Sequence, residues 1–276
     1  MTPIPTATAH TLDVPGARLH YEVRGSGPLV VLVGAPMDAA AFAPLAELLA
    51  TDHTVLTTDP RGHQSSVLDD PDQDSTPRLR ADDLARLISH LGIGPAALFG
   101  SSGGAVSALA LAEAQPDLVT TVIAHEPPLG ELLDDRDRVR ANTEDMIATY
   151  QTGDVVGAWR KFMANANIQM PEPVLQQMFG GERDPRQRAS ERYWFNHELL
   201  GTVTWEPNNT VLQSTPARIV IGIGADSTDQ LCDRASRALG TVIGVTPTIF
   251  PGGHTGFVED PTAFATRLRE VLEAAS

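Results

Sequence analysis

Short apolar runs alternate along the chain with longer amphipathic stretches that have the period of an α-helix. This alternation is typical of parallel β-strands joined by crossover helices, and it predicts an α/β domain. The strands with the clearest apolar pattern are expected at residues 53–59, 96–100, 118–125, 217–224 and 246–253. The clearest helices are expected at residues 39–50, 80–92 and 261–275.

Two segments depart from this alternation. In residues 17–34, two predicted strands are separated only by a turn at residues 25–28, which is too short for a crossover and favours an antiparallel pair. Residues 129–214 carry charged, methionine-bearing and aromatic helical segments without a clear strand. We therefore expect a helical lid at 129–214, inserted into a core domain formed by residues 1–128 and 215–276.

Residues 100–104 read GSSGG and match the pattern G-x-S-x-G between a predicted strand and a predicted helix. A sharp strand-to-helix turn holds its central residue in strained backbone geometry and needs small neighbours, because the backbone passes close to other segments. This context predicts Ser102 as an exposed nucleophile. The backbone N–H of Gly103, at the start of the helix, would donate to an oxyanion.

Two further motifs, together with the first, resemble the α/β-hydrolase fold family. Residues 59–66 (DPRGHQSS) are similar to the family's D-x-R-G-x-G-x-S, except that Gln64 replaces a glycine. Residues 33–36 (VGAP) are similar to its H-G-x-P loop without the histidine, which implies that Ala35 supplies the second oxyanion N–H. The resemblance covers nearly the whole chain outside the lid. It implies a mostly parallel eight-stranded sheet with helices on both faces and a helical cap.

A serine nucleophile needs a histidine that accepts its proton and a carboxylate that orients the histidine. His254 lies after the last predicted strand and before the last helix, where the family carries its catalytic histidine. His63 is the next candidate by position, and we expect it to be a surface or substrate-facing residue instead. His125 follows a buried strand, where it is expected to be an ordinary histidine of the strand end.

The carboxylate has two candidates. In most members of the family the acid follows the strand after the lid, in a pattern like G-x-x-D, but here Ser227 stands at that place and Asp226 one residue earlier. A minority carry the acid after the sixth strand, where this chain has Glu126. A glutamate at the end of a buried strand is costly unless it is paired, and a histidine would pair it. The sequence favours Glu126, with Asp226 as the alternative.

Charge and composition exclude several other classes of protein. The formal net charge is −15, with 20 basic residues against 35 acidic ones, which argues against a nucleic-acid partner. One cysteine, Cys232, cannot form an internal disulfide, and the N-terminal segment resembles no secretory signal. No apolar stretch approaches the ~18 residues of a membrane span. A cytoplasmic protein without a membrane partner is therefore expected.

The substrate class is predicted only broadly. A serine at the strand-to-helix turn argues for acyl transfer. No H-E-x-x-H motif or cluster of Cys and His indicates a metal site. No cofactor is expected. The apolar residues of the lid favour a small molecule with an apolar acyl or aromatic group, and they are Met146, Trp159, Phe162, Met163, Met170, Met178, Phe179, Trp194 and Phe195.

We therefore expect a carboxylic ester hydrolase that also admits lactones or thioesters. A cofactor-free haloperoxidase, a C–C hydrolase or a lyase would use the same three residues, and a non-catalytic binding protein of this fold is a further alternative. The sequence leaves the oligomeric state open.

Overall fold

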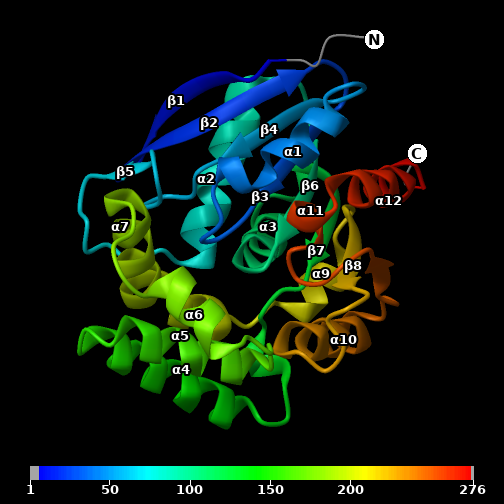
Figure 1. Ribbon diagram of the computed structural model, residues 1–276. Helices are drawn as coiled ribbons and strands as arrows, with labels where there is room; N and C mark the ends of the chain where they lie inside the picture. Colours follow the sequence, from blue (N-terminus) through cyan, green and yellow to red (C-terminus); the bar gives the residue numbers. More distant parts are fainter. Residues whose placement is uncertain (1–5, 275–276) are drawn as a thin grey trace.

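The computed structural model describes residues 6–274, so residues 1–5 and 275–276 of the expected core domain, with the last residue of the expected helix at 261–275, lie outside the described residues. The described part contains one nine-stranded sheet with the order β1-β2-β4-β3-β6-β7-β8-β9, and β5 pairs with β2 (Figure 1). The strands are β1 (Thr8–Val14), β2 (Ala17–Gly25), β3 (Leu29–Val33), β4 (Thr54–Thr58), β5 (Val67–Leu68), β6 (Ala96–Ser101), β7 (Val119–His125), β8 (Arg218–Gly224) and β9 (Thr248–Phe250).

The sheet is parallel from β4 to β9, whereas β1, β2 and β5 pair in antiparallel fashion. This arrangement confirms the predicted α/β fold, with the short β5 in addition to the eight expected strands. The expected pairing of the two strands in residues 17–34 is wrong. The turn at 25–28 does reverse the chain, but β4 lies between β2 and β3, and the N–H of Thr54 donates to the carbonyl of Pro28 at 3.0 Å.

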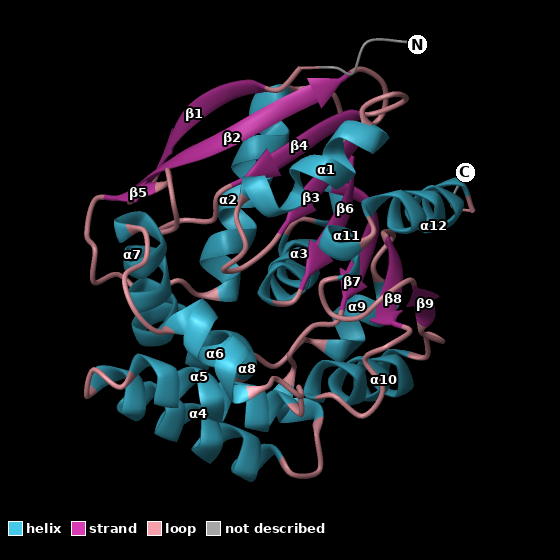
Figure 2. Ribbon diagram, viewed as in Figure 1, coloured by secondary structure: helices cyan, strands magenta, loops and turns pink. Residues whose placement is uncertain are grey.

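Helices cover both faces of the sheet, and each face has its own apolar core (Figure 2). In β6, Leu98 belongs to one core and its neighbour Phe99 to the other, because successive side chains of a strand point to opposite faces. The Phe99 face is covered by α1 (Ala39–Leu49), α11 (Gly256–Glu259) and α12 (Pro261–Glu273). The Leu98 face is covered by α2 (Pro77–Leu91), α3 (Gly103–Ala114) and α10 (Leu231–Ile243).

A group of helices lies between β7 and β8 in the chain and gathers at the end of the sheet where the parallel strands finish (Figure 1). The short helices η1 (Pro116–Leu118) and η2 (Gly130–Leu132) lie before and after β7. The group consists of α4 (Arg136–Gln151), α5 (Val155–Ala166), α6 (Glu172–Phe179), α7 (Pro185–Tyr193), the π-helical turn η3 (Trp194–Glu198), α8 (Leu199–Val203) and α9 (Asn209–Ser214). Within residues 6–274, no helix combines the length and the apolar character needed to cross a membrane.

Candidate active site

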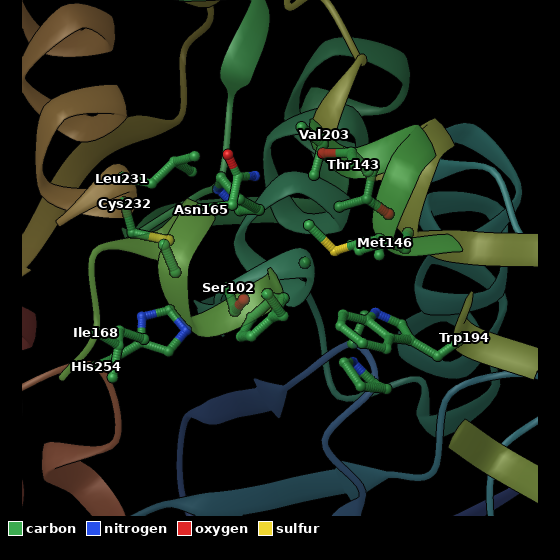
Figure 3. A pocket seen from close by; sticks show the side chains of 18 of the residues that line it. Ser102, Thr143, Met146, Asn165, Ile168, Trp194, Val203, Leu231, Cys232 and His254 are labelled. Atoms are coloured by element: carbon green, nitrogen blue, oxygen red, sulfur yellow. The ribbon is translucent and has the colours of Figure 1, made fainter. Parts of the chain in front are cut away.

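Ser102 stands at the turn between β6 and α3 with φ 56° and ψ −124°, a backbone conformation that residues other than glycine rarely adopt. Its N–H donates to the carbonyl of His125 at 2.9 Å, which ties the turn to β7. A Cβ atom on Gly100 would lie 2.5 Å from the carbonyl oxygen of Gly104, and one on Gly104 would lie 2.2 Å from that of Val33. The turn therefore needs both glycines, and it presents Ser102 to a cavity (Figure 3).

Gly103 and Ala35 lie against each other beside Ser102. A Cβ atom on Gly103 would come within 2.5 Å of the carbonyl oxygen of Ala35, and both residues line the same cavity as Ser102. Neither backbone N–H has a protein acceptor among the described residues. Two unpaired N–H groups next to a serine are the arrangement that an oxyanion requires.

Glu126 directly follows β7 and contacts the loop that carries His254. The two are joined by a hydrogen bond of 2.6 Å between Nδ1 of His254 and Oε2 of Glu126. The other carboxylate oxygen accepts the N–H of Gly224 at 2.8 Å, so the end of β8 holds it in place. The Glu126 side chain is fully buried, whereas that of His254 is 24% exposed. A buried carboxylate with these partners fixes both the position and the tautomer of His254.

The electrostatics of this pair follow from its contacts. Burial alone would raise the pKa of Glu126, but the hydrogen bond and charge of His254 outweigh burial and lower the pKa of Glu126 to about 2. Burial alone would lower the pKa of His254, but Cys232 and Glu126 beside it raise the pKa of His254 above its ordinary value of 6.5. The carboxylate therefore stays ionised throughout the neutral range and favours a proton on the imidazole.

Ser102 and His254 line the same cavity, but no hydrogen bond joins them in the described structure. Catalytic hydrogen bonds are often long in an enzyme without substrate and tighten in the complex. The structure thus brings Glu126 and His254 into direct contact, and it places Ser102, Gly103 and Ala35 around the same space.

The other candidate residues lie elsewhere. Asp226 is exposed, and its carboxylate makes no hydrogen bond to His254. Ser227 is fully buried near the Glu126 carboxylate and helps to lower the pKa of Glu126, although its hydroxyl has no hydrogen bond of normal geometry.

His63 and His125 are both fully buried, so the expectation of a surface or substrate-facing His63 is wrong. Nε2 of His63 lies 3.1 Å from Oε2 of Glu198, and the pair joins the segment after β4 to η3. His125 packs against Phe99 and other aromatic rings, and burial lowers the pKa of His125 to about 4. It is a neutral residue of the core.

The cavity at Ser102 has a volume of about 270 Å³ and a predominantly apolar wall. Among the described residues that line it, there is no aspartate, glutamate, lysine or arginine. Of the apolar lid residues identified in the sequence, four line it: Met146, Trp159, Phe162 and Trp194. Sequence reasoning missed Gln230, Leu231 and Cys232, because helix α10 was not among the predicted elements. It missed Asn165 of α5 because only the apolar residues of segment 129–214 were considered. Within residues 6–274, no cluster of three His, Cys, Asp or Glu side chains has the arrangement of a metal site.

Comparison with known proteins agrees with this fold. The model of the alpha/beta hydrolase family matches residues 29–267. An uncharacterised hydrolase of Bacillus subtilis (strain 168), YraK, is 33% identical over 95% of both chains.

Two solved structures are similar over most of this chain. One is the N-acyl homoserine lactone degrading enzyme Est816, with a TM-score of 0.73 and 20% identity over 95% of this chain and 99% of that one. The other is E-2-(acetamidomethylene)succinate hydrolase, with a TM-score of 0.68 and 21% identity over 97% of this chain and 100% of that one. At this level of identity the two structures show the fold alone. The family match and the full-length relative show more: the chain belongs to the alpha/beta hydrolase family and is a hydrolase.

Proposed function

We propose that the protein is a serine hydrolase that cleaves a small, neutral carboxylic ester through an acyl-enzyme on Ser102. The observation that carries the proposal is the contact between the buried Glu126 carboxylate and His254, at the cavity that Ser102 also lines. In this assignment His254 is the general base and Glu126 orients it. Lactones and thioesters carry the same reactive carbonyl and would react through the same groups.

The proposed reaction uses these groups in the usual order of acyl transfer. The N–H at Nδ1 of His254 donates a hydrogen bond to Oε2 of Glu126, so the unprotonated Nε2 can accept the proton of Ser102. The serine oxygen adds to the carbonyl carbon, and the N–H groups of Ala35 and Gly103 donate to the oxyanion that forms. Its collapse breaks the bond to the leaving oxygen, which takes the proton from His254. Water then adds to the acyl-enzyme by the same route and releases the acid.

The composition of the cavity wall supports a neutral substrate. Of the solved structures with this fold, one is named for a substrate with two carboxylates, a succinate. Binding such an anion calls for arginine or lysine, and none lines this cavity. An apolar wall of tryptophan, phenylalanine, methionine and leucine instead favours an apolar acyl group.

We also propose that residues 129–214 act as the lid of this site, on a core of residues 1–128 and 215–276. Trp159 of α5 stacks on Trp194 of η3 and on Phe179 of α6, with ring centroids 5.3 and 4.2 Å apart. This aromatic cluster lies against the cavity, which supports a role of the segment in enclosing the substrate.

The proposal is tested with esters, lactones and thioesters of one acyl group, on wild type, Ser102→Ala and Ser101→Ala. Ser101 is the matched control, because it is the buried neighbour of Ser102 and faces His125. A fluorophosphonate followed by peptide mass mapping should label Ser102 in wild type and in Ser101→Ala, and not in Ser102→Ala. Turnover in Ser102→Ala at the wild-type rate would overturn the proposal.

A further inference from the structure

The cavity wall has a different character on the two sides of Ser102. Figure 3 shows one group of residues on the side where His254 lies, and a second group on the other side. The first group includes Asn165, Ile168, Leu231 and Cys232, and the second includes Thr143, Met146, Trp194 and Val203. The first group comes from the end of α5, from Ile168 shortly after it, and from the start of α10. The second group comes from α4, η3 and α8.

The His254 side is a defined wall because the end of α5 is attached to the segment before α10. The side-chain N–H of Asn167 donates to the carbonyl of Asp229 at 3.1 Å. Asn165, two residues earlier, is half-buried and lines the cavity (Figure 3). Asn165 is held by this attachment of the end of α5 and by a hydrogen bond from Asn142 of α4.

Free hydrogen-bonding groups occur on this side. Oδ1 of Asn165 accepts a hydrogen bond of 3.0 Å from Nδ2 of Asn142, which leaves the Asn165 NH₂ group without an acceptor among the described residues. The side-chain amide of Gln230, at the start of α10, also has no protein partner in the described structure. On the opposite side, the hydroxyl of Thr143 already donates to the carbonyl of Val139 at 2.8 Å.

The geometry of acyl transfer assigns the two halves of the ester to these two sides. His254 must give its proton to the leaving oxygen, so the leaving group occupies the His254 side of Ser102. The acyl chain leaves the reacting carbon in another direction and occupies the apolar side.

We infer that the leaving group is a neutral alcohol with its own hydrogen-bond acceptor, held by the Asn165 NH₂ group, while the acyl chain is purely apolar. This inference rests on the proposed function and adds the class of alcohol and the residue that selects it. The volume of about 270 Å³ lies just below the ~300–1,000 Å³ range of ligand pockets, so the ester is small.

Three esters of nearly identical shape test the assignment: butyl pentanoate, 2-methoxyethyl pentanoate and butyl 3-methoxypropanoate. In the second an ether oxygen replaces a methylene in the alcohol, and in the third it does so in the acyl chain. We expect the ratio of kcat/KM for the second ester to that for the first to fall about fivefold in Asn165→Leu, because one hydrogen bond is lost. The ratio of kcat/KM for butyl 3-methoxypropanoate to that for butyl pentanoate should not change.

Asn196→Leu is the matched control, since Asn196 is an exposed asparagine of the same lid and does not line the cavity. An unchanged alcohol ratio in Asn165→Leu, or a change in the acyl ratio instead, overturns the inference while the proposed function stands.

Absence of turnover in wild type would count against the proposed function, and the inference is then tested by binding. In Ser102→Ala, the fluorescence of Trp159 and Trp194 reports binding of the same esters. Asn165→Leu in that background should weaken binding of the methoxyethyl ester about fivefold relative to the butyl ester. Equal weakening of both esters would overturn the inference.

Discussion

The backbone N–H of Gly224 donates to Oε1 of Glu126 at 2.8 Å, so the end of β8 holds a carboxylate that belongs to the end of β7. The second oxygen of that carboxylate is thereby left for His254. The family's usual acid position, three residues after Gly224, is occupied by the buried Ser227. The ends of β7 and β8 thus together hold the carboxylate that contacts His254.

Glu126→Gln should lower turnover by about 10³–10⁴-fold, because the amide cannot stabilise the imidazolium that forms in the transition state. Asp226→Asn, an exposed residue without a contact to His254, should change turnover less than about twofold. Both variants are assayed at pH 7 after their folding is checked by circular dichroism. If Asp226→Asn is inactive and Glu126→Gln stays active, Asp226 and not Glu126 orients His254.

Ser227→Asp should restore part of the activity of Glu126→Gln, because it supplies a carboxylate at the other strand end beside the same histidine. In the wild-type background the same substitution should reduce activity, since two carboxylates at one buried site cannot both ionise freely. The measurement is kcat in the two single variants and the double variant. Equal activity of Glu126→Gln with and without Ser227→Asp would refute the idea of exchangeable positions.

The pH dependence of kcat/KM should rise through the pKa of His254, because the imidazole acts as a base only when it is neutral. Cys232 and Glu126 raise that pKa, so the wild-type midpoint should lie above 6.5. Glu126→Gln removes the carboxylate, so the midpoint should move to lower pH while the plateau falls. An unchanged midpoint in a folded variant would show that Glu126 does not face His254 in solution.

Glu198→Ala should destabilise the fold strongly. The fully buried Glu198 contacts His63 and lies 3.7 Å from Nη1 of the buried Arg80, so its removal leaves a buried cation unpaired. We expect a loss of about 3–5 kcal/mol in the free energy of unfolding, measured by urea titration. Glu172→Ala is the control, because the pair of Glu172 with Arg160 is exposed and its loss should have little effect. Equal effects of the two would show that the buried contacts do not stabilise the fold.

Much of the fold could be predicted because the parallel strands are buried on both faces and read as continuous apolar runs. Local signals failed where the structure depends on distant segments. The turn at 25–28 indicated a reversal of the chain but could not reveal that β4 lies between the two strands. Strand β1 was missed because five of its seven residues are exposed, and only Leu12 and Val14 at its end pack into the core.

Helix α10 could have been found, since apolar or small residues recur every four positions at 231, 235, 239 and 243. Because α10 was not predicted, Leu231 and Cys232 at its start were not identified as part of the cavity wall. The strand-to-helix turn at Ser102 was predictable because its tight backbone requires glycines at 100 and 104. The sequence favoured Glu126 over Asp226 because a buried carboxylate needs a partner, but only the structure shows that Glu126 contacts His254. The catalytic roles stay predictions, supported by that contact.

The hydrogen bond between Glu126 and His254 joins residues 128 positions apart in the chain. Contacts over such separations form late, because the chain must give up the entropy of a long loop before they are made. During synthesis from the N-terminus, Ser102 and Glu126 leave the ribosome well before His254, and β9 must join the edge of the sheet before His254 reaches its place. A newly made chain therefore already contains the nucleophile and the carboxylate of the candidate site before the histidine that would complete it has been added.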